Sequence, residues 1–274
     1  MTYFWRRRIR NGLLTALVVL AFAWLFKWQR DSLQRDSFTS GYVILGCVLF
    51  LALYNFRKKM PNIPLGSSAT WMQLHIYVGI GSIFIFVQHV GFRIPDGIFE
   101  RTLGGLFVAV ASSGVYGLYL TRTAPRKLAQ LKEEVIFERI PAMRNHLAIQ
   151  ASDLALQSVP KTQASAIAEF YANRLHHFFV RPRSVLFHLA PSSRQRRRLM
   201  SELGHMQQYC SADEKSISEQ LFSLIRQKDD LDYQYALQSK LKNWFFLHIG
   251  LTYSLIVFSL LHTVLVHAFF GGRL

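Results

Sequence analysis

The sequence predicts an all-α integral membrane protein, a helical bundle with five transmembrane helices and one helical insertion. Hydrophobic residues make up 51% of the 274 residues, and they gather in long uncharged runs. Several runs approach the ~20 residues that an α-helix needs to cross a bilayer. The net charge of +16 falls mainly outside these runs. Strong basicity also suggests nucleic-acid binding, but that function needs no such runs, so no nucleic-acid partner is expected.

Five segments are long and apolar enough to span the membrane: 11–28, 39–56, 71–92, 102–121 and 244–270. The first lacks a small-residue cleavage site, so we interpret it as a retained anchor rather than a signal peptide. The expected organisation is therefore 1–121 with helices one to four, an insertion over 122–243, and 244–274 with helix five and an outer tail.

Charge in the connections predicts the orientation. Positive clusters without acids lie at Arg6–Arg10 and Arg57–Lys59, and another lies at Arg122–Lys127, whereas the connections after the first and third spans balance their charges. Short cytoplasmic connections carry the excess of Lys and Arg. The N-terminus and the insertion are therefore expected in the cytoplasm and the C-terminus in the periplasm, with the chain surrounded by lipid in a bacterial inner membrane.

The insertion, 122–243, reads as a small helical domain because apolar residues recur every three or four positions. Its basic run at 194–198 is expected to contact anionic lipid. His176, His177 and His188 have no carboxylate or cysteine at metal-ligand spacing, so a metal site is not expected there.

Two predicted spans each carry a pair of histidines. His75 and His89 lie on the third span, His248 and His262 on the fifth, and both pairs are 14 residues apart. Such a pair returns to within about 40° of one helix face and is separated by about 21 Å along the axis. Because both spans run outward, His75 is expected level with His248 near the inner surface, and His89 level with His262 near the outer surface.

Two facing histidines at each of two depths are the ligand set of two bis-histidine haems b. The alternative is that the histidines only hydrogen-bond across helices, which a single histidine would favour more than two matched pairs. His267 lies about 140° round the helix from His262, so it is expected off the haem face. An interfacial position is favoured, and a propionate contact, or a role as ligand or relay toward an outer partner, stays open.

This histidine pattern resembles the di-haem cytochrome b of the quinol–cytochrome c reductases. It is also similar to the transmembrane domain of ferric reductases and NADPH oxidases. The resemblance covers spans two to five and implies His75, His89, His248 and His262 as axial iron ligands. Comparison with cytochrome b also suggests glycines against which porphyrin edges could pack, and the candidates are Gly79, Gly104, Gly117 and Gly250. Small residues serve ordinary helix packing equally well.

The chain departs from these families in lacking a flavin or nicotinamide module and a quinol-site motif, and in carrying the long insertion. The expected function is that of a di-haem b-type cytochrome subunit in a larger complex. It would carry electrons between redox partners on opposite sides of the membrane, such as c-type cytochromes or iron–sulfur proteins. Two alternatives stay open: a quinol/quinone oxidoreductase membrane subunit that uses quinone, and a non-redox membrane anchor or assembly protein.

Overall fold

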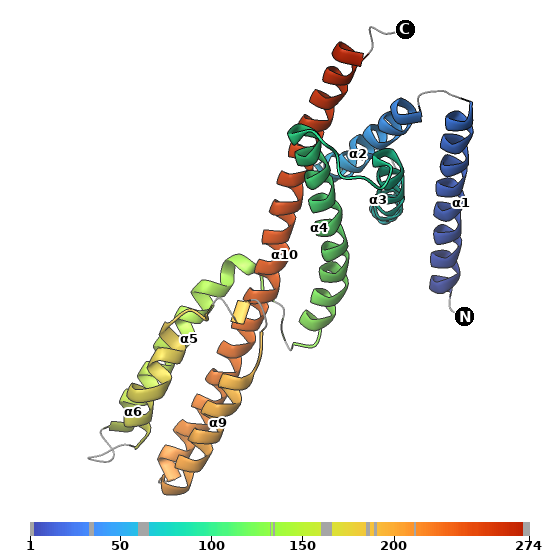
Figure 1. Ribbon diagram of the computed structural model, residues 1–274. Helices are drawn as coiled ribbons and strands as arrows, with labels where there is room; N and C mark the ends of the chain where they lie inside the picture. Colours follow the sequence, from blue (N-terminus) through green and yellow to red (C-terminus); the bar gives the residue numbers. More distant parts are fainter. Residues whose placement is uncertain are drawn as a thin grey trace. The chain divides into compact units, whose positions relative to one another are not determined.

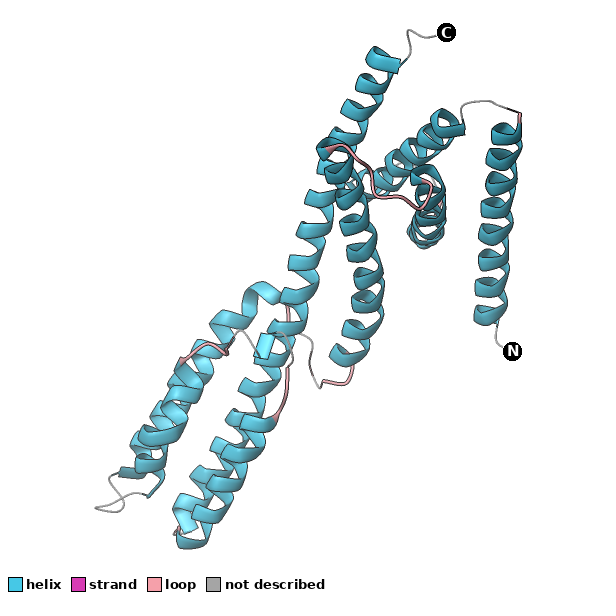
Figure 2. Cartoon of the chain, viewed as in Figure 1, coloured by secondary structure: helices cyan, strands magenta, loops and turns pink. Residues whose placement is uncertain are grey.

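The computed structural model describes residues 3–32, 36–59, 66–131, 133, 135–159, 166–184, 187–188, 191–210 and 212–270. Over these residues the chain is helical and contains no β-strand (Figure 2). Five helices are long and apolar enough to cross a membrane. The fold expected from the sequence, an all-helical protein with five candidate spans, is confirmed at this level, and the expected tail at 271–274 lies outside the described residues.

The chain divides into two compact units. Unit 1 comprises Met1–Leu118 and Phe245–Leu274, and unit 2 comprises Tyr119–Trp244. These boundaries lie within three residues of those expected from the sequence, 121/122 and 243/244.

Unit 1 contains α1 (Tyr3–Asp31), α2 (Asp36–Lys59), α3 (Ser68–Val90), most of α4 (Ile98–Leu128) and the C-terminal part of α10 (Ala212–Phe270) (Figure 1). Both α1 and α2 pack against α3. Helix α3 begins at the N-cap Ser67, whose hydroxyl accepts a hydrogen bond from the Thr70 amide, and ends at Gly91 in the left-handed conformation. Large apolar side chains stay exposed on these helices, as expected of helices that face lipid.

A small apolar cluster joins α2, α4 and α10 in unit 1. Val48, Phe107 and Leu255 are buried there. Phe86 from α3 stacks on Phe107 with ring centroids 4.1 Å apart. This cluster joins α3, α4 and α10, the three helices that carry the predicted site residues, to α2.

Unit 2 is a helical domain with its own apolar core. Its helices are η1 (Phe137–Arg139), α5 (Ile140–Ser158), α6 (Ala166–Phe170), the π-helix η3 (Tyr171–Leu175), α7 (His176–Val180), α9 (Arg194–Met206), η4 (Gln207–Tyr209) and the N-terminal part of α10. Core side chains such as Ile140, Ile167, Leu175 and Leu203 are fully buried.

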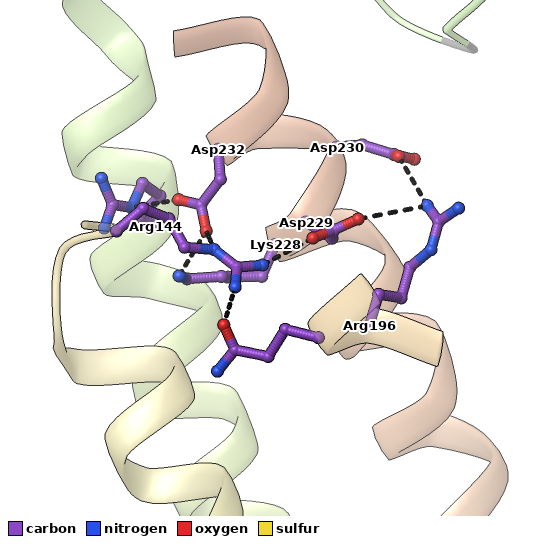
Figure 3. Close-up of polar contacts among 8 residues, drawn as sticks. Arg144, Arg196, Lys228, Asp229, Asp230 and Asp232 are labelled. Atoms are coloured by element: carbon purple, nitrogen blue, oxygen red, sulfur yellow. Dashed lines mark hydrogen bonds and ion pairs between the residues drawn. The ribbon is translucent and has the colours of Figure 1, made fainter. Parts of the chain in front are cut away.

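A buried ionic network crosses the core of unit 2 (Figure 3). Asp232 pairs with Arg144 at 3.1 Å, with Arg183 at 2.7 Å and with Lys228 at 2.5 Å. Asp229 pairs with Arg183 at 2.5 Å. The network ties α5 and the segment after α7 to α10, because each acid is shared by cations from different elements.

Candidate functional site

The first histidine pair brings α3 and α10 together. The rings of His75 and His248 lie with their centroids 6.4 Å apart, at an interplanar angle of 73°. A metal bound to one nitrogen of each ring, at the ~2 Å of an imidazole–metal bond, would hold the two centroids about 6 Å apart. The observed spacing therefore fits a shared axial metal.

Hydrogen bonds assign the ring protons of this pair. His75 Nδ1 lies 3.2 Å from the Leu51 carbonyl oxygen, which can only accept, so this nitrogen carries the proton. His248 Nδ1 lies 2.6 Å from Ser113 Oγ. The Ser113 hydroxyl donates its own proton to the Val110 carbonyl at 2.9 Å, so it accepts from His248. Each ring thus keeps a Nε2 lone pair, the usual state of a metal-ligating histidine held by a second shell.

The second histidine level repeats this arrangement for His89. His89 Nδ1 lies 2.8 Å from Ser40 Oγ, and the Ser40 hydroxyl donates to the Ser37 carbonyl at 3.1 Å. His89 therefore donates from Nδ1 and keeps its Nε2 lone pair, as His248 does.

His89 and His262 line one cavity of about 590 Å³ between α2, α3, α4 and α10. The His262 ring stacks on Phe99 with centroids 6.2 Å apart. His262 Nδ1 is buried and has no hydrogen-bond partner among the described residues. An orphaned buried nitrogen in a cavity of ligand size points to a bound group.

His267 also lies beside the second histidine level. This residue was expected off the face that carries His262, yet it lines the same cavity. The cavity is wide enough to be lined by two neighbouring faces of α10, with His262 against Phe99 of α4 and His267 against α2. His267 Nδ1 donates to the Thr263 carbonyl at 2.7 Å, and its Nε2 accepts from the Tyr42 hydroxyl at 2.6 Å.

Two Ser-Gly dipeptides, Ser40-Gly41 and Ser113-Gly114, support the histidines, and the sequence analysis missed them. A Cβ added at Gly41 would lie 3.2 Å from His89 Cε1, and one at Gly114 would lie 3.7 Å from His248 Cε1. In each case the serine accepts from Nδ1 and the adjacent glycine leaves room for the neighbouring ring carbon. The signal was the same dipeptide on the candidate span that precedes each ligand-bearing span, α2 before α3 and α4 before α10.

The four expected glycines have unequal surroundings. Gly79 lines the smaller cavity beside His75 and His248. Gly104 would meet only Phe86, at 3.7 Å, and Gly117 is buried. A side chain at Gly250 would point into open space.

The fit to haem differs between the two levels. At the first level the ring spacing and protonation fit, but the cavity has a volume of about 120 Å³, below the ~300 Å³ of small ligand pockets. A porphyrin at this level would require the apolar side chains that close the cavity to rotate outward. At the second level the cavity volume fits. Phe107 and Leu255 line both cavities and so separate the levels.

The three histidines of unit 2 that the sequence analysis considered have aromatic neighbours. His176 and His177 touch each other, and His188 contacts Phe187 and Tyr235. No cluster of three or more His, Cys, Asp or Glu able to hold a metal occurs in the described part of the chain.

No family model, curated protein or solved structure matches the chain. The geometry of unit 1 therefore stands alone as the basis for a function.

Proposed function

We propose that the protein is a di-haem b-type cytochrome subunit that carries electrons across a membrane between partners on opposite sides. The observation that carries the proposal is the His75–His248 pair, whose ring centroids lie 6.4 Å apart and whose Nδ1 atoms both act as donors. Both Nδ1 atoms are held by groups on neighbouring helices, the Leu51 carbonyl of α2 and the Ser113 hydroxyl of α4, which fixes the orientation of both rings.

His75 and His248 would hold one haem, and His89 and His262 the other. Bis-histidine haem supplies a one-electron couple whose potential depends on its ligands and surroundings. The Leu51 carbonyl oxygen, Ser113 and Ser40 orient the imidazoles for haem binding, and apolar side chains exclude water. Phe107 and Leu255 set the distance between the two levels.

The setting that best suits this function is a bacterial inner membrane, with the N-terminus in the cytoplasm and the C-terminus in the periplasm. The positive clusters at Arg6–Arg10 and Arg122–Lys127 support this orientation. Because the sequence carries no flavin or nicotinamide motif, the electron donor and acceptor are other proteins, such as c-type cytochromes or iron–sulfur proteins in a larger complex.

Proteoliposomes test transmembrane electron flow. Ferricyanide is trapped inside, dithionite is added outside, and ferricyanide absorbance is followed against protein-free vesicles. The wild type should accelerate bleaching. His75→Leu and His262→Leu should each return the rate to that of empty vesicles, because a ~30 Å apolar core then lacks one intermediate site. His205→Leu, at an exposed position of unit 2, is the matched control. Undiminished flow in either pair variant would refute transmembrane electron transfer by two haems.

The cavity at the second level also favours a second candidate, a quinol/quinone oxidoreductase subunit. Tyr42 and His267 form a hydrogen-bonded pair beside about 590 Å³ of mainly apolar space, which suits a quinone head group. The same space cannot hold a haem and a quinone together. One haem per chain, with haem reduction that requires added quinol, would select this candidate.

A further inference from the structure

Unit 2 contains a basic cavity that the proposed electron transfer does not use. It has a volume of about 620 Å³ and lies where α7 ends and α9 begins. Its cationic and hydroxyl side chains are Arg174, His177, Arg181, Arg183, Ser184, Ser192 and Arg194. None of the described residues that line it is acidic.

Arg183 forms the back wall of this cavity rather than a free binding group. Its guanidinium donates to Asp232, Asp229 and Gln195 and lies 4.8 Å from the centroids of both Phe178 and Phe187. Its side chain is only 7% exposed. Three of the five N–H groups of Arg183 are therefore already used, and these contacts hold its guanidinium in place.

Arg181 and Arg194 are the free cations of the cavity. Both are exposed, and neither pairs with an acid in the part of the chain that the structure describes. Arg174 reaches Glu202 only at 3.8 Å with its side chain 55% exposed, which is a weak surface pair. Three guanidiniums are thus available to one ligand.

The start of α9 adds a second, independent indication of an anion. This 13-residue helix has no acid in its first turn, and its N-cap Ser193 makes no side-chain capping bond. The N-terminus of a helix carries partial positive charge and favours anions. Placing Arg194 there runs against that preference, and a bound anion would remove the conflict.

The ionic network behind the cavity also has surplus positive charge. Its four cations are Arg144, Arg183, Arg196 and Lys228, and its three acids are Asp229, Asp230 and Asp232. Burial, together with repulsion from Arg183 and Arg144, lowers the pKa of Lys228 to about 8, against the attraction of Asp232. The acids of the network therefore do not neutralise the positive potential at the cavity.

The helix that delivers Arg174 is irregular. Tyr171–Leu175 forms a π-helix, a form that is rare and frequent at functional sites. It places Arg174 and the following His177 on the same cavity.

We propose that this cavity binds a ligand that carries two phosphate groups, held by Arg181, Arg194 and Arg174. Guanidiniums match phosphate oxygens in pairs. Such a ligand has two sources, the diphosphate group of a soluble ester or the headgroup of cardiolipin. This site is independent of the haem proposal, because none of its residues lies in unit 1.

Calorimetric titration of the full-length protein in phosphatidylcholine nanodiscs tests the site, with inorganic pyrophosphate as the probe. Saturable binding is expected, and Arg181→Gln with Arg194→Gln should weaken it about tenfold or more, the loss of two charge-assisted contacts. The matched control removes two exposed arginines of unit 2 outside the cavity, Arg139→Gln with Arg197→Gln. Binding should then stay within about twofold.

Nanodiscs that contain cardiolipin separate the two sources. A soluble ligand predicts the same pyrophosphate affinity in both lipid mixtures, whereas a lipid headgroup that fills the cavity predicts weaker pyrophosphate binding in the cardiolipin discs. Absence of pyrophosphate binding in phosphatidylcholine discs would overturn the proposal. Equal weakening in the cavity variant and in the control would overturn it too, because net charge rather than the cavity would then bind the probe.

Discussion

Unit 1 and unit 2 bury polar side chains in different ways. In unit 1 the partly buried rings of His75, His89 and His248 are each fixed through one nitrogen to a carbonyl or a serine. In unit 2 the buried polar groups include charges that contact one another, with Asp232 touching three cations. Every buried charged residue that the structure describes lies in unit 2.

The difference follows from the surroundings of each unit. A charge inside a bilayer is expensive, so a membrane unit is restricted to neutral groups with single, well-directed hydrogen bonds. A neutral imidazole that donates from Nδ1 carries no proton on Nε2, which is the form in which histidine binds metals. In the network of unit 2 the core acids are saturated with cations, so Asp229 and Asp232 hold the fold and are not free for chemistry.

The largest effect of a substitution is expected at the histidines of unit 1, where it should remove a haem. His75→Leu and His248→Leu should each remove the same haem entirely and leave one per chain, because either change leaves the iron with one axial ligand. The remaining midpoint in a redox titration should be common to both variants and differ from that of His89→Leu. His267→Leu, in which the lost ring already uses both nitrogens, should keep two haems. Different midpoints for the His75 and His248 variants would break the pairing.

The next largest effect is expected in unit 2. Asp232→Ala leaves the buried Lys228 and the partly buried Arg144 and Arg183 without their shared acid, and should destabilise the unit by about 3–5 kcal/mol. Asp230→Ala removes a carboxylate that pairs with Arg196 and is 31% exposed, and should cost about 1 kcal/mol or less.

Alkylation of the two cysteines can follow the unfolding of each unit separately. Cys210 is buried in the core of unit 2, and Cys47 lies in α2 of unit 1. In a urea series with pulsed alkylation and mass spectrometry, Asp232→Ala should expose Cys210 at lower urea while Cys47 is unchanged. Equal urea midpoints for the two aspartate variants would mean that Asp232 is not the centre of the network.

A smaller effect is expected at the serine that orients His248. Ser113→Ala removes the acceptor of Nδ1, and loss of such a second-shell partner typically weakens metal binding about 10–100-fold. Haem retention during dilution should fall in Ser113→Ala and stay normal in Ser112→Ala, an exposed neighbour on the same helix. Equal retention would show that the ring is held by packing alone.

The pH dependence of unit 2 should be set in part by Lys228. Its pKa in the folded protein is lowered to about 8, mainly by burial. The unfolded chain therefore binds more protons than the folded one between pH ~8 and ~10.5, and this residue makes stability rise with pH in that window. The rise in the urea midpoint should be smaller in Lys228→Met. An identical rise in both proteins would exclude Lys228 as its source.

The smallest effect tests the contact between Gly41 and His89. Gly41→Ala places a methyl group 3.2 Å from the ring, so the imidazole must shift by a few tenths of an ångström. We expect a shifted midpoint for one haem with both haems retained. Gly46→Ala, on the same helix with open space around it, should leave both midpoints unchanged.

The sequence alone predicted the five spans, since their length and hydropathy depend on local composition. The sequence also placed His75 beside His248, because the fixed rise per residue sets the depth of each residue on two parallel helices. The hydrogen-bond acceptors of the histidines, Leu51, Ser40 and Ser113, were not predicted. They meet the histidines because two helices pack together, and the periodicity of one helix carries no information on that packing.

His267 shows that helical periodicity does not predict which residues line one cavity. The angle between His262 and His267 is real, but a cavity bounded by four helices can be lined by both faces of α10. The ionic network of unit 2 was also not predicted, because Arg144, Arg183 and Asp232 come together from three separate segments.

The ratio of haem b to polypeptide tests the central claim most directly. Haem is measured by the pyridine haemochrome method in the purified protein, and polypeptide by amino-acid analysis of the same sample. We predict two haems b per chain, with a low-spin spectrum from bis-histidine ligation. A ratio of one would contradict the two-level account and select the quinone alternative, and a ratio of zero would contradict haem binding altogether.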